Sequence, residues 1–114
     1  MMIELRLYRD ADGDCPFAEW LERLPDRQAR ARIQSRLARV AGGNVGDAKS
    51  VGGGVHELRI DWGPGYRVYF ARFGSVVVLL LCGGDKRTQG KDIRRAKDCL
   101  EDYVARTGTA KERR

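Results

Sequence analysis

Apolar and polar residues alternate in the first residues of the chain and again through its second half. Positions 3, 5 and 7 are apolar, which predicts a strand over Ile3–Tyr8 with one buried face. A longer stretch, Val55–Gln89, is interrupted by Gly63-Pro64-Gly65 and by Phe73-Gly74, and both interruptions are typical of turns between antiparallel strands. The long stretch therefore predicts a three-stranded antiparallel meander.

The alternation also predicts which residues of the meander share a face. If Trp62 lies opposite Tyr66 across the loop, one face of the hairpin is apolar and consists of Leu58, Ile60, Trp62, Tyr66, Val68 and Phe70. The other face then carries Arg59 opposite Tyr69 and Asp61 opposite Arg67. A slip of one residue would exchange the two faces and bury the arginines.

The third strand of the meander, Val76–Cys82, is apolar at every position, which is typical of a strand that is covered on both sides. A pair of glycines follows it. We expect these glycines to let the backbone turn sharply before Lys86.

Helical spacing of apolar residues predicts two helices before the meander and one after it. The first begins at Pro16 and ends near Pro25. The second is capped by Asp26 and ends at Gly42-Gly43. Residues 44–54 are rich in glycine and are expected to form a loop, and the last helix is expected to begin after Thr88.

The predicted order of elements is β-α-α-β-β-β-α. This order indicates an α+β fold in which the helices pack on one face of an antiparallel sheet. A chain of 114 residues forms one domain, which we expect over residues 1–104. The polar and basic residues 105–114 are expected to be a flexible tail.

The charge of the chain favours an anionic partner. Lys and Arg number 22 against 16 Asp and Glu, and the resulting net charge of +6 is typical of proteins that bind nucleic acid, an acidic protein or a membrane surface. The N-terminus lacks the apolar region of a signal peptide, and the apolar run Val76–Cys82 is too short to cross a membrane. We therefore expect a cytoplasmic protein with no membrane partner.

The cysteines indicate neither a disulfide framework nor a metal site. Cys15, Cys82 and Cys99 are odd in number and far apart, and His56 is the one histidine of the chain. Cys82 and Cys99 lie in apolar patterns and are expected to be small buried residues. We expect no metal and no cofactor.

Cations on the polar face of the meander and just beyond it form the best candidate for a catalytic site: Arg59, Arg67, Lys86 and Arg87, with Tyr69 beside them. Fixed cations stabilise the negative charge that develops on a phosphate when RNA is cleaved by its own 2′-hydroxyl. The chain has no pair of histidines for proton transfer, so Lys86 is the candidate base. The alternative is a solvated basic surface, or one that binds an acidic partner.

A second group of cations lies outside the meander. It comprises Arg32, Arg36 and Arg39 on the second helix and Lys49 in the glycine-rich loop, and we consider these candidate RNA-binding residues. The alternative is a solvated helix face. Within the meander, Glu57 and Asp61 lie beside Arg59 and Arg67 and are expected to pair with them.

Three strings of the sequence are similar to a known family. G-G-G-V-H-E-L-R-I (52–60), G-P-G-Y-R-V-Y-F (63–70), and V-L-L-L-C-G-G-D-K-R-T-Q (78–89) followed by D-I-R-R-A (92–96) closely resemble the addiction-module killer proteins. These are HigB-like members of the RelE/ParE toxin superfamily. Any one string alone would be weak, whereas the combination is specific.

The resemblance implies the RelE-like fold and the toxin of a type II toxin–antitoxin module, neutralised in a hetero-oligomer by a helix-turn-helix antitoxin. It further implies an endoribonuclease that uses basic residues on its sheet to cleave mRNA in the ribosomal A site and so inhibits translation. By position, the implied residues are Arg67 in the middle strand, Arg59 in the strand before it, and Lys86 or Arg87 after the last strand.

One departure from the family pattern leaves the acid and base of this reaction open. Many RelE nucleases carry a tyrosine early in the last helix, where this chain has Ile93, and Tyr69 is the substitute candidate. ParE-type relatives share the fold but inhibit DNA gyrase without nuclease activity, so the fold does not decide the function. A gyrase inhibitor and a relative that only binds its antitoxin are therefore the alternatives.

Overall fold

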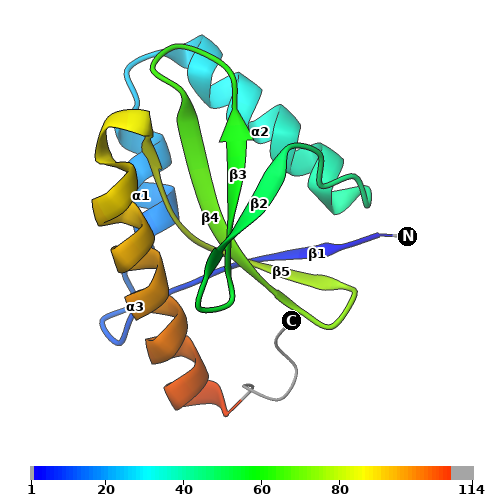
Figure 1. Ribbon diagram of the computed structural model, residues 1–114, viewed down its shortest axis with the longest axis vertical. Coiled ribbons are helices and arrows are strands. Elements are labelled where there is room, and N and C mark those ends of the chain that lie inside the picture. The colour runs from blue at the N-terminus through cyan, green and yellow to red at the C-terminus, as the bar shows by residue number, and fades with distance from the viewer. Residues whose placement is uncertain (1, 109–114) are drawn as a thin grey trace.

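A computed structural model describes residues 2–108 of the chain (Figure 1). The elements follow the order β1 (Glu4–Leu7), α1 (Pro16–Arg23), α2 (Arg27–Ala41), β2 (Ala48–Gly52), β3 (Val55–Ile60), β4 (Tyr66–Phe73), β5 (Val77–Asp85), a 3₁₀ turn (Lys86–Thr88) and α3 (Gln89–Thr107). Asp26 caps α2 as predicted, because its side chain accepts a hydrogen bond from the N–H of Gln28. The α+β class is confirmed.

The sheet has five strands in the order β1-β5-β4-β3-β2, one more strand than predicted. The additional strand is β2, which lies in the segment expected to be a loop and pairs antiparallel with β3 at one edge. At the opposite edge β1 pairs with β5 in parallel, so the prediction of a purely antiparallel sheet is wrong. The helical pair carries the chain from one edge of the sheet to the other, and the meander then returns to β1.

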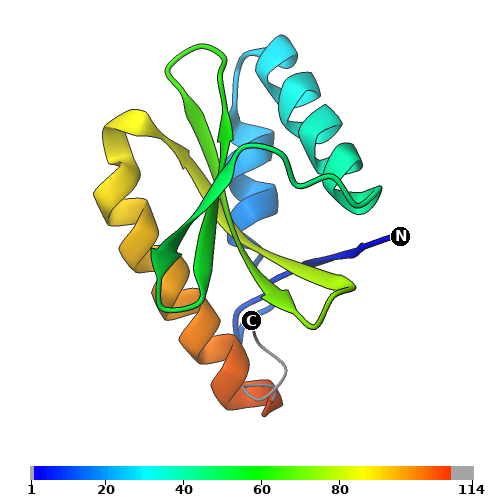
Figure 2. The same ribbon diagram turned by 45° about the vertical axis from the view of Figure 1, so that its right-hand side comes forward.

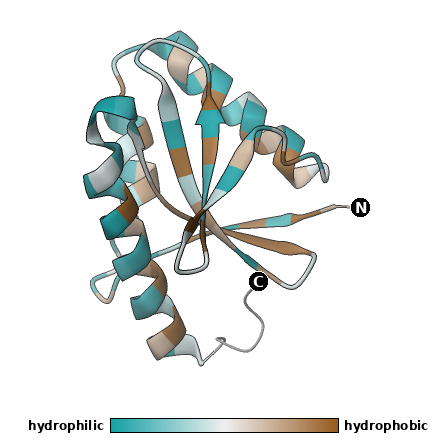
Figure 3. Cartoon of the chain, in the orientation of Figure 1, coloured by the Kyte–Doolittle hydropathy of each residue, from teal (hydrophilic) through white to brown (hydrophobic). Residues whose placement is uncertain are grey.

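Helices cover both faces of the sheet, which corrects the prediction that they pack on one face (Figure 2). Residues of α1 and α2 pack on one face against Val78 and Leu80 of β5. Residues of α3 pack on the other face against Leu79 and Leu81. Two apolar layers therefore enclose β5, and Figure 3 shows this strand and the inner sides of the helices as hydrophobic. The uninterrupted apolar run of β5 is the sequence signal of this arrangement.

The β3–β4 hairpin has the predicted faces but a different register. Ile60 lies opposite Tyr66, and Arg59 lies opposite Arg67. This register differs by two residues from the predicted one, because Trp62 belongs to the turn, where its carbonyl accepts a hydrogen bond from the N–H of Gly65. A shift of two residues preserves the two faces, whereas a shift of one would exchange them.

The glycine pair 83–84 lies inside β5 and does not form the predicted turn. A Cβ on Gly83 would overlap the indole ring of Trp20 on α1, and a Cβ on Gly84 would overlap the carboxylate of Asp92 on α3. Glycine is required here by close packing on both faces of the strand. The turn follows at Lys86–Thr88, where the side chain of Asp85 accepts a hydrogen bond from the N–H of Arg87.

The end of the chain differs in part from the expected tail. Helix α3 continues through Thr107, so residues 105–107 are helical, and Gly108 caps the helix in a left-handed conformation. The other residues of the expected tail, 109–114, lie outside the described part of the chain.

We expect Gly83→Ala to destabilise the protein, because the added methyl group meets the ring of Trp20. Overpacking of this kind costs roughly 1–3 kcal/mol. Gly90→Ala is the matched control, since Gly90 lies on α3, where a Cβ would make only an ordinary contact of 3.8 Å with Nη1 of Arg94, and this change should stabilise the fold by up to about 1 kcal/mol. Denaturant unfolding of both variants checks this, and a Gly83→Ala protein as stable as the wild type would contradict it.

Candidate functional site

Three of the predicted cations line one open pocket beside the β3–β4 loop. Arg59 and Arg67 face each other on adjacent strands, and Lys86 is joined to the loop by a hydrogen bond of 2.9 Å from its N–H to the carbonyl of Gly65. The pocket has a volume of about 570 Å³ and is lined by Asp47, Arg59, Asp61, Gly63, Pro64, Gly65, Arg67 and Lys86. The fold therefore brings together residues from two strands and the turn after β5.

The two arginines of the pocket pair with different carboxylates. The Arg59 guanidinium donates to Asp47 over 2.7 and 3.2 Å, and this hydrogen bond raises the pKa of Arg59. Arg67 lies with its Nε 3.8 Å from Oε1 of Glu57, one of the two carboxylates expected to pair with these arginines, whereas the pairing of Arg59 with Asp47 was not expected. Asp61, the other carboxylate expected to pair with these arginines, takes part in neither ion pair. In the described part of the chain Lys86 forms no ion pair, so its charge is available to a ligand.

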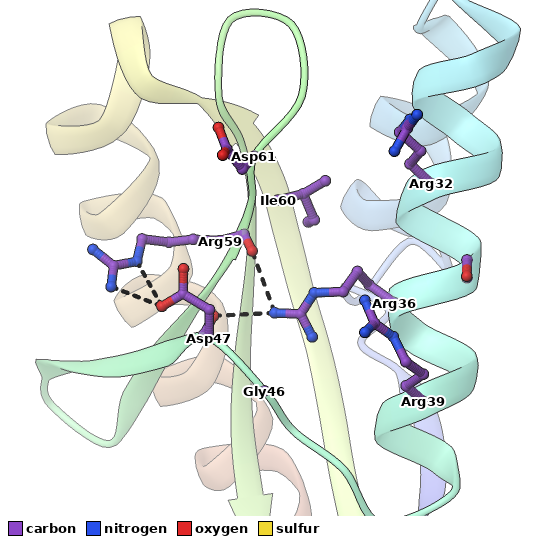
Figure 4. Close-up of a pocket in the computed structure, with 9 residues that line it drawn as sticks. Arg32, Arg36, Arg39, Gly46, Asp47, Arg59, Ile60 and Asp61 are labelled. Carbon is purple, nitrogen blue, oxygen red and sulfur yellow. Dashed lines mark hydrogen bonds and ion pairs between the residues drawn. The ribbon is translucent and has the colours of Figure 1, made fainter.

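A second pocket of about 400 Å³ adjoins the first and shares Asp47, Arg59 and Asp61 with it. Figure 4 shows the side chains of Arg32, Arg36 and Arg39 on α2 at this second pocket. Arg59, Arg67 and Lys86 thus lie along one continuous surface with Arg32 and Arg39.

Arg36 has a structural position in this surface. Its side chain is buried, and its guanidinium donates to the carbonyls of Val45, Asp47 and Arg59 over 2.9, 3.2 and 3.3 Å. Burial lowers the pKa of Arg36. Because these hydrogen bonds join α2 to β3 and to the segment before β2 (Figure 4), we assign Arg36 to the support of the site and not to ligand contact.

Other predicted site residues lie outside the two pockets. Arg87 is exposed and pairs with Asp85, whose pKa it lowers through their hydrogen bond. Tyr69 has no exposed surface, and burial together with the adjacent Glu57 raises its pKa. It therefore cannot touch a substrate in this structure. Lys49 is exposed on β2, opposite Glu57 of β3.

Two carboxylates of the described residues are buried, Glu57 and Asp92, and the sequence predicted the burial of neither, although Glu57 was expected to pair with a neighbouring arginine. The Glu57 carboxylate is fully buried and accepts hydrogen bonds from Tyr69 and from the side chain of Gln89. Asp92 is also buried and accepts a hydrogen bond from Thr88. The burial of Glu57 could have been predicted, because Glu57 shares a face of the sheet with Tyr69.

The described residues also bring three carboxylates together away from these pockets, although the sequence indicated no metal cluster. Asp10, Asp12 and Asp14 lie in the loop between β1 and α1. Oδ1 of Asp10 accepts hydrogen bonds of 2.9 Å from the N–H groups of Asp12 and Asp14, which explains why the loop folds this way.

None of the helices in the described part is long and apolar enough to cross a membrane.

Comparison with known proteins places the chain in a family without assigning an activity. No model of a known protein family matches it. An uncharacterized protein of Haemophilus influenzae is 54% identical over 81 residues, which cover 71% of this chain and 82% of that protein. The chain therefore belongs to the same family as this H. influenzae protein.

We expect Arg36→Met to destabilise the fold, because the substitution keeps the apolar stem and removes the guanidinium donor from the carbonyls of Val45 and Arg59. The carbonyl of Asp47 keeps its hydrogen bond from the N–H of Arg59. Unsatisfied buried groups cost about 1–3 kcal/mol each. Arg39→Gln is the control, since Arg39 is exposed on the same helix and should change stability by less than about 0.5 kcal/mol. The free energy of unfolding of both variants checks this, and equal stability of the two would refute the structural role of Arg36.

Proposed function

We propose that this chain is the toxin of a type II toxin–antitoxin module, a HigB-like member of the RelE/ParE superfamily with the RelE-like fold. Its activity is that of a metal-independent endoribonuclease that cleaves ribosome-bound mRNA in the cytoplasm and so inhibits translation. Its partners are the ribosome, the message and a helix-turn-helix antitoxin. An acidic segment of the antitoxin would complement the cations of the pocket.

The observation that carries this proposal is the meeting of Arg59, Arg67 and Lys86 at one pocket. These cations come from β3, β4 and the turn after β5, three segments that are separate in sequence. Such an arrangement suits a phosphate whose negative charge increases in the transition state. The similarity of the 52–60, 63–70 and 78–89 strings to the killer proteins supports the same function.

A second candidate function, inhibition of DNA gyrase without catalysis, is favoured by a different observation. Tyr69 is fully buried, and the position early in α3 where many RelE nucleases carry a tyrosine holds Ile93. Of the predicted groups for proton transfer, Lys86 alone lies at the pocket. A surface that only binds a partner would need no acid and base.

Induction of the protein in cells, followed by mapping of mRNA 5′ ends, distinguishes the two candidates. Cuts in frame within translated regions would support the endonuclease. Intact mRNA together with stalled and broken DNA would support the gyrase inhibitor and refute the endonuclease.

We expect Arg67→Ala and Lys86→Ala to lower the single-turnover rate of mRNA cleavage on ribosomes by ~10²–10³. Both cations act on charge that develops in the transition state, so the affinity for ribosomes should change little. If Lys86 is the base, Lys86→Ala should also flatten the rise of the rate with pH.

The control for this experiment is Lys91→Ala, which removes an exposed lysine of α3 that does not line either pocket. This variant should cleave at the wild-type rate. Folded Arg67→Ala and Lys86→Ala proteins that also cleave at that rate would overturn the catalytic assignment.

We expect Arg32→Gln and Arg39→Gln to reduce the salt dependence of ribosome binding. For every phosphate that a variant no longer neutralises, the slope of log affinity against log salt should become shallower by about 0.7, the value for single strands. Titration of binding against salt concentration measures this slope, with Lys91→Gln as the control. A slope unchanged in both arginine variants would mean that this face of α2 is only solvated.

A further inference from the structure

The Glu57 carboxylate lies beneath the pocket in a defined set of contacts. It has no exposed surface. Its Oε2 accepts hydrogen bonds from the hydroxyl of Tyr69 over 3.1 Å and from Nε2 of Gln89 over 2.6 Å. Its Oε1 lies 3.8 Å from Nε of Arg67, and the Arg67 side chain is 12% exposed. Three elements, β3, β4 and the start of α3, therefore meet at this carboxylate.

The two atoms separated by 3.8 Å have no hydrogen-bond partner among the described residues. Oε1 of Glu57 and Nε of Arg67 are both buried, and neither forms a hydrogen bond. A buried carboxylate and a buried guanidinium are costly unless they compensate each other. Tyr69 and Gln89 fix the orientation of the Glu57 carboxylate, so its Oε1 stays directed at Nε of Arg67.

The rest of the Arg67 side chain points toward the pocket. Arg67 lines the pocket together with Lys86, and a Cβ on Gly65 of the hairpin loop would lie 3.3 Å from Arg67 Nη1. Nη1 donates to the carbonyl of Tyr66 over 3.1 Å. One end of the guanidinium thus faces the buried carboxylate, and the other end is held at the loop.

We propose that Glu57 is the positioning residue of the site: it holds the guanidinium of Arg67 at the pocket between the hairpin loop and Lys86, where that group meets a phosphate. That the ligand is a phosphate rests on the proposed function, whereas the positioning of Arg67 by Glu57 does not. Glu57 does not touch the ligand, because it lies wholly beneath the surface.

Glu57→Gln tests this positioning with little change in size. The glutamine carbonyl can still accept hydrogen bonds from Tyr69 and Gln89, but its NH₂ group then faces the Nε–H of Arg67. The electrostatic attraction for Arg67 is lost and two N–H donors face each other, so the guanidinium is no longer held at the pocket. Glu101→Gln makes the same chemical change at an exposed position of α3 and is the matched control.

The first measurement is hydrogen exchange of the Arg67 Nε–H group by NMR, with its signal assigned by its absence in Arg67→Lys. In the wild type this group should exchange more slowly than that of exposed Arg94, and in Glu57→Gln it should exchange as fast as Arg94. If Glu57→Gln does not fold, Tyr69→Phe removes one hydrogen bond from the carboxylate and should give an intermediate rate. Fast exchange in the wild type, or slow exchange in a folded Glu57→Gln protein, overturns the proposal.

The second measurement is the single-turnover rate of RNA cleavage on ribosomes. Misplacement of Arg67 in Glu57→Gln should lower this rate by up to about 10²-fold. The double variant Glu57→Gln/Arg67→Ala should be no slower than Arg67→Ala, because both changes remove the same effect. Independent reductions that multiply, or an unchanged rate in Glu57→Gln, overturn positioning. If the wild type cuts no RNA, the proposed function fails, and the exchange measurement alone decides the role of Glu57.

Discussion

The attraction between a buried carboxylate and a largely buried guanidinium connects the interior of this protein to its surface. Glu57 and Arg67 lie on adjacent strands, and Gln89 joins the same carboxylate to the start of α3. Desolvated charges tolerate little displacement, since each depends on the other for compensation. The position of Arg67 at the pocket therefore depends on the interior packing of the sheet against α3 as well as on the hairpin loop, to which Lys86 is hydrogen-bonded.

The spacing of apolar residues was sufficient to predict most elements, and their alternation predicted both faces of the hairpin but not its register. Period-two patterns are unchanged by a shift of two residues, so the pairing of Ile60 with Tyr66 depended on the conformation of the turn at Trp62. Edge strand β2 was missed because short, half-exposed strands among glycines carry little pattern. The fully apolar β5 indicated that helices cover both faces of the sheet. The prediction that they pack on one face did not take this pattern into account.

The cations of the candidate site could be predicted from sequence, whereas their separate roles could not. Arg32, Arg36 and Arg39 follow one helical spacing, yet Arg36 alone is committed to backbone carbonyls. That difference arises from the path of the chain before β2, which periodicity does not describe. Tyr69 likewise shares the face of Arg67 but lies under α3, a contact between segments far apart in sequence.

The parallel pairing of β1 with β5 has a consequence for the synthesis of the chain. The strands from β2 to β5 pair with their neighbours in sequence, while Glu4 pairs with Val77, and α1 packs on β5. β1 and α1 therefore lack their partners until β5 has emerged from the ribosome, and contacts so distant in sequence form slowly. Until β5 has been made, β1 has no strand to pair with and α1 has no sheet to pack on, so this domain closes only late in its own synthesis.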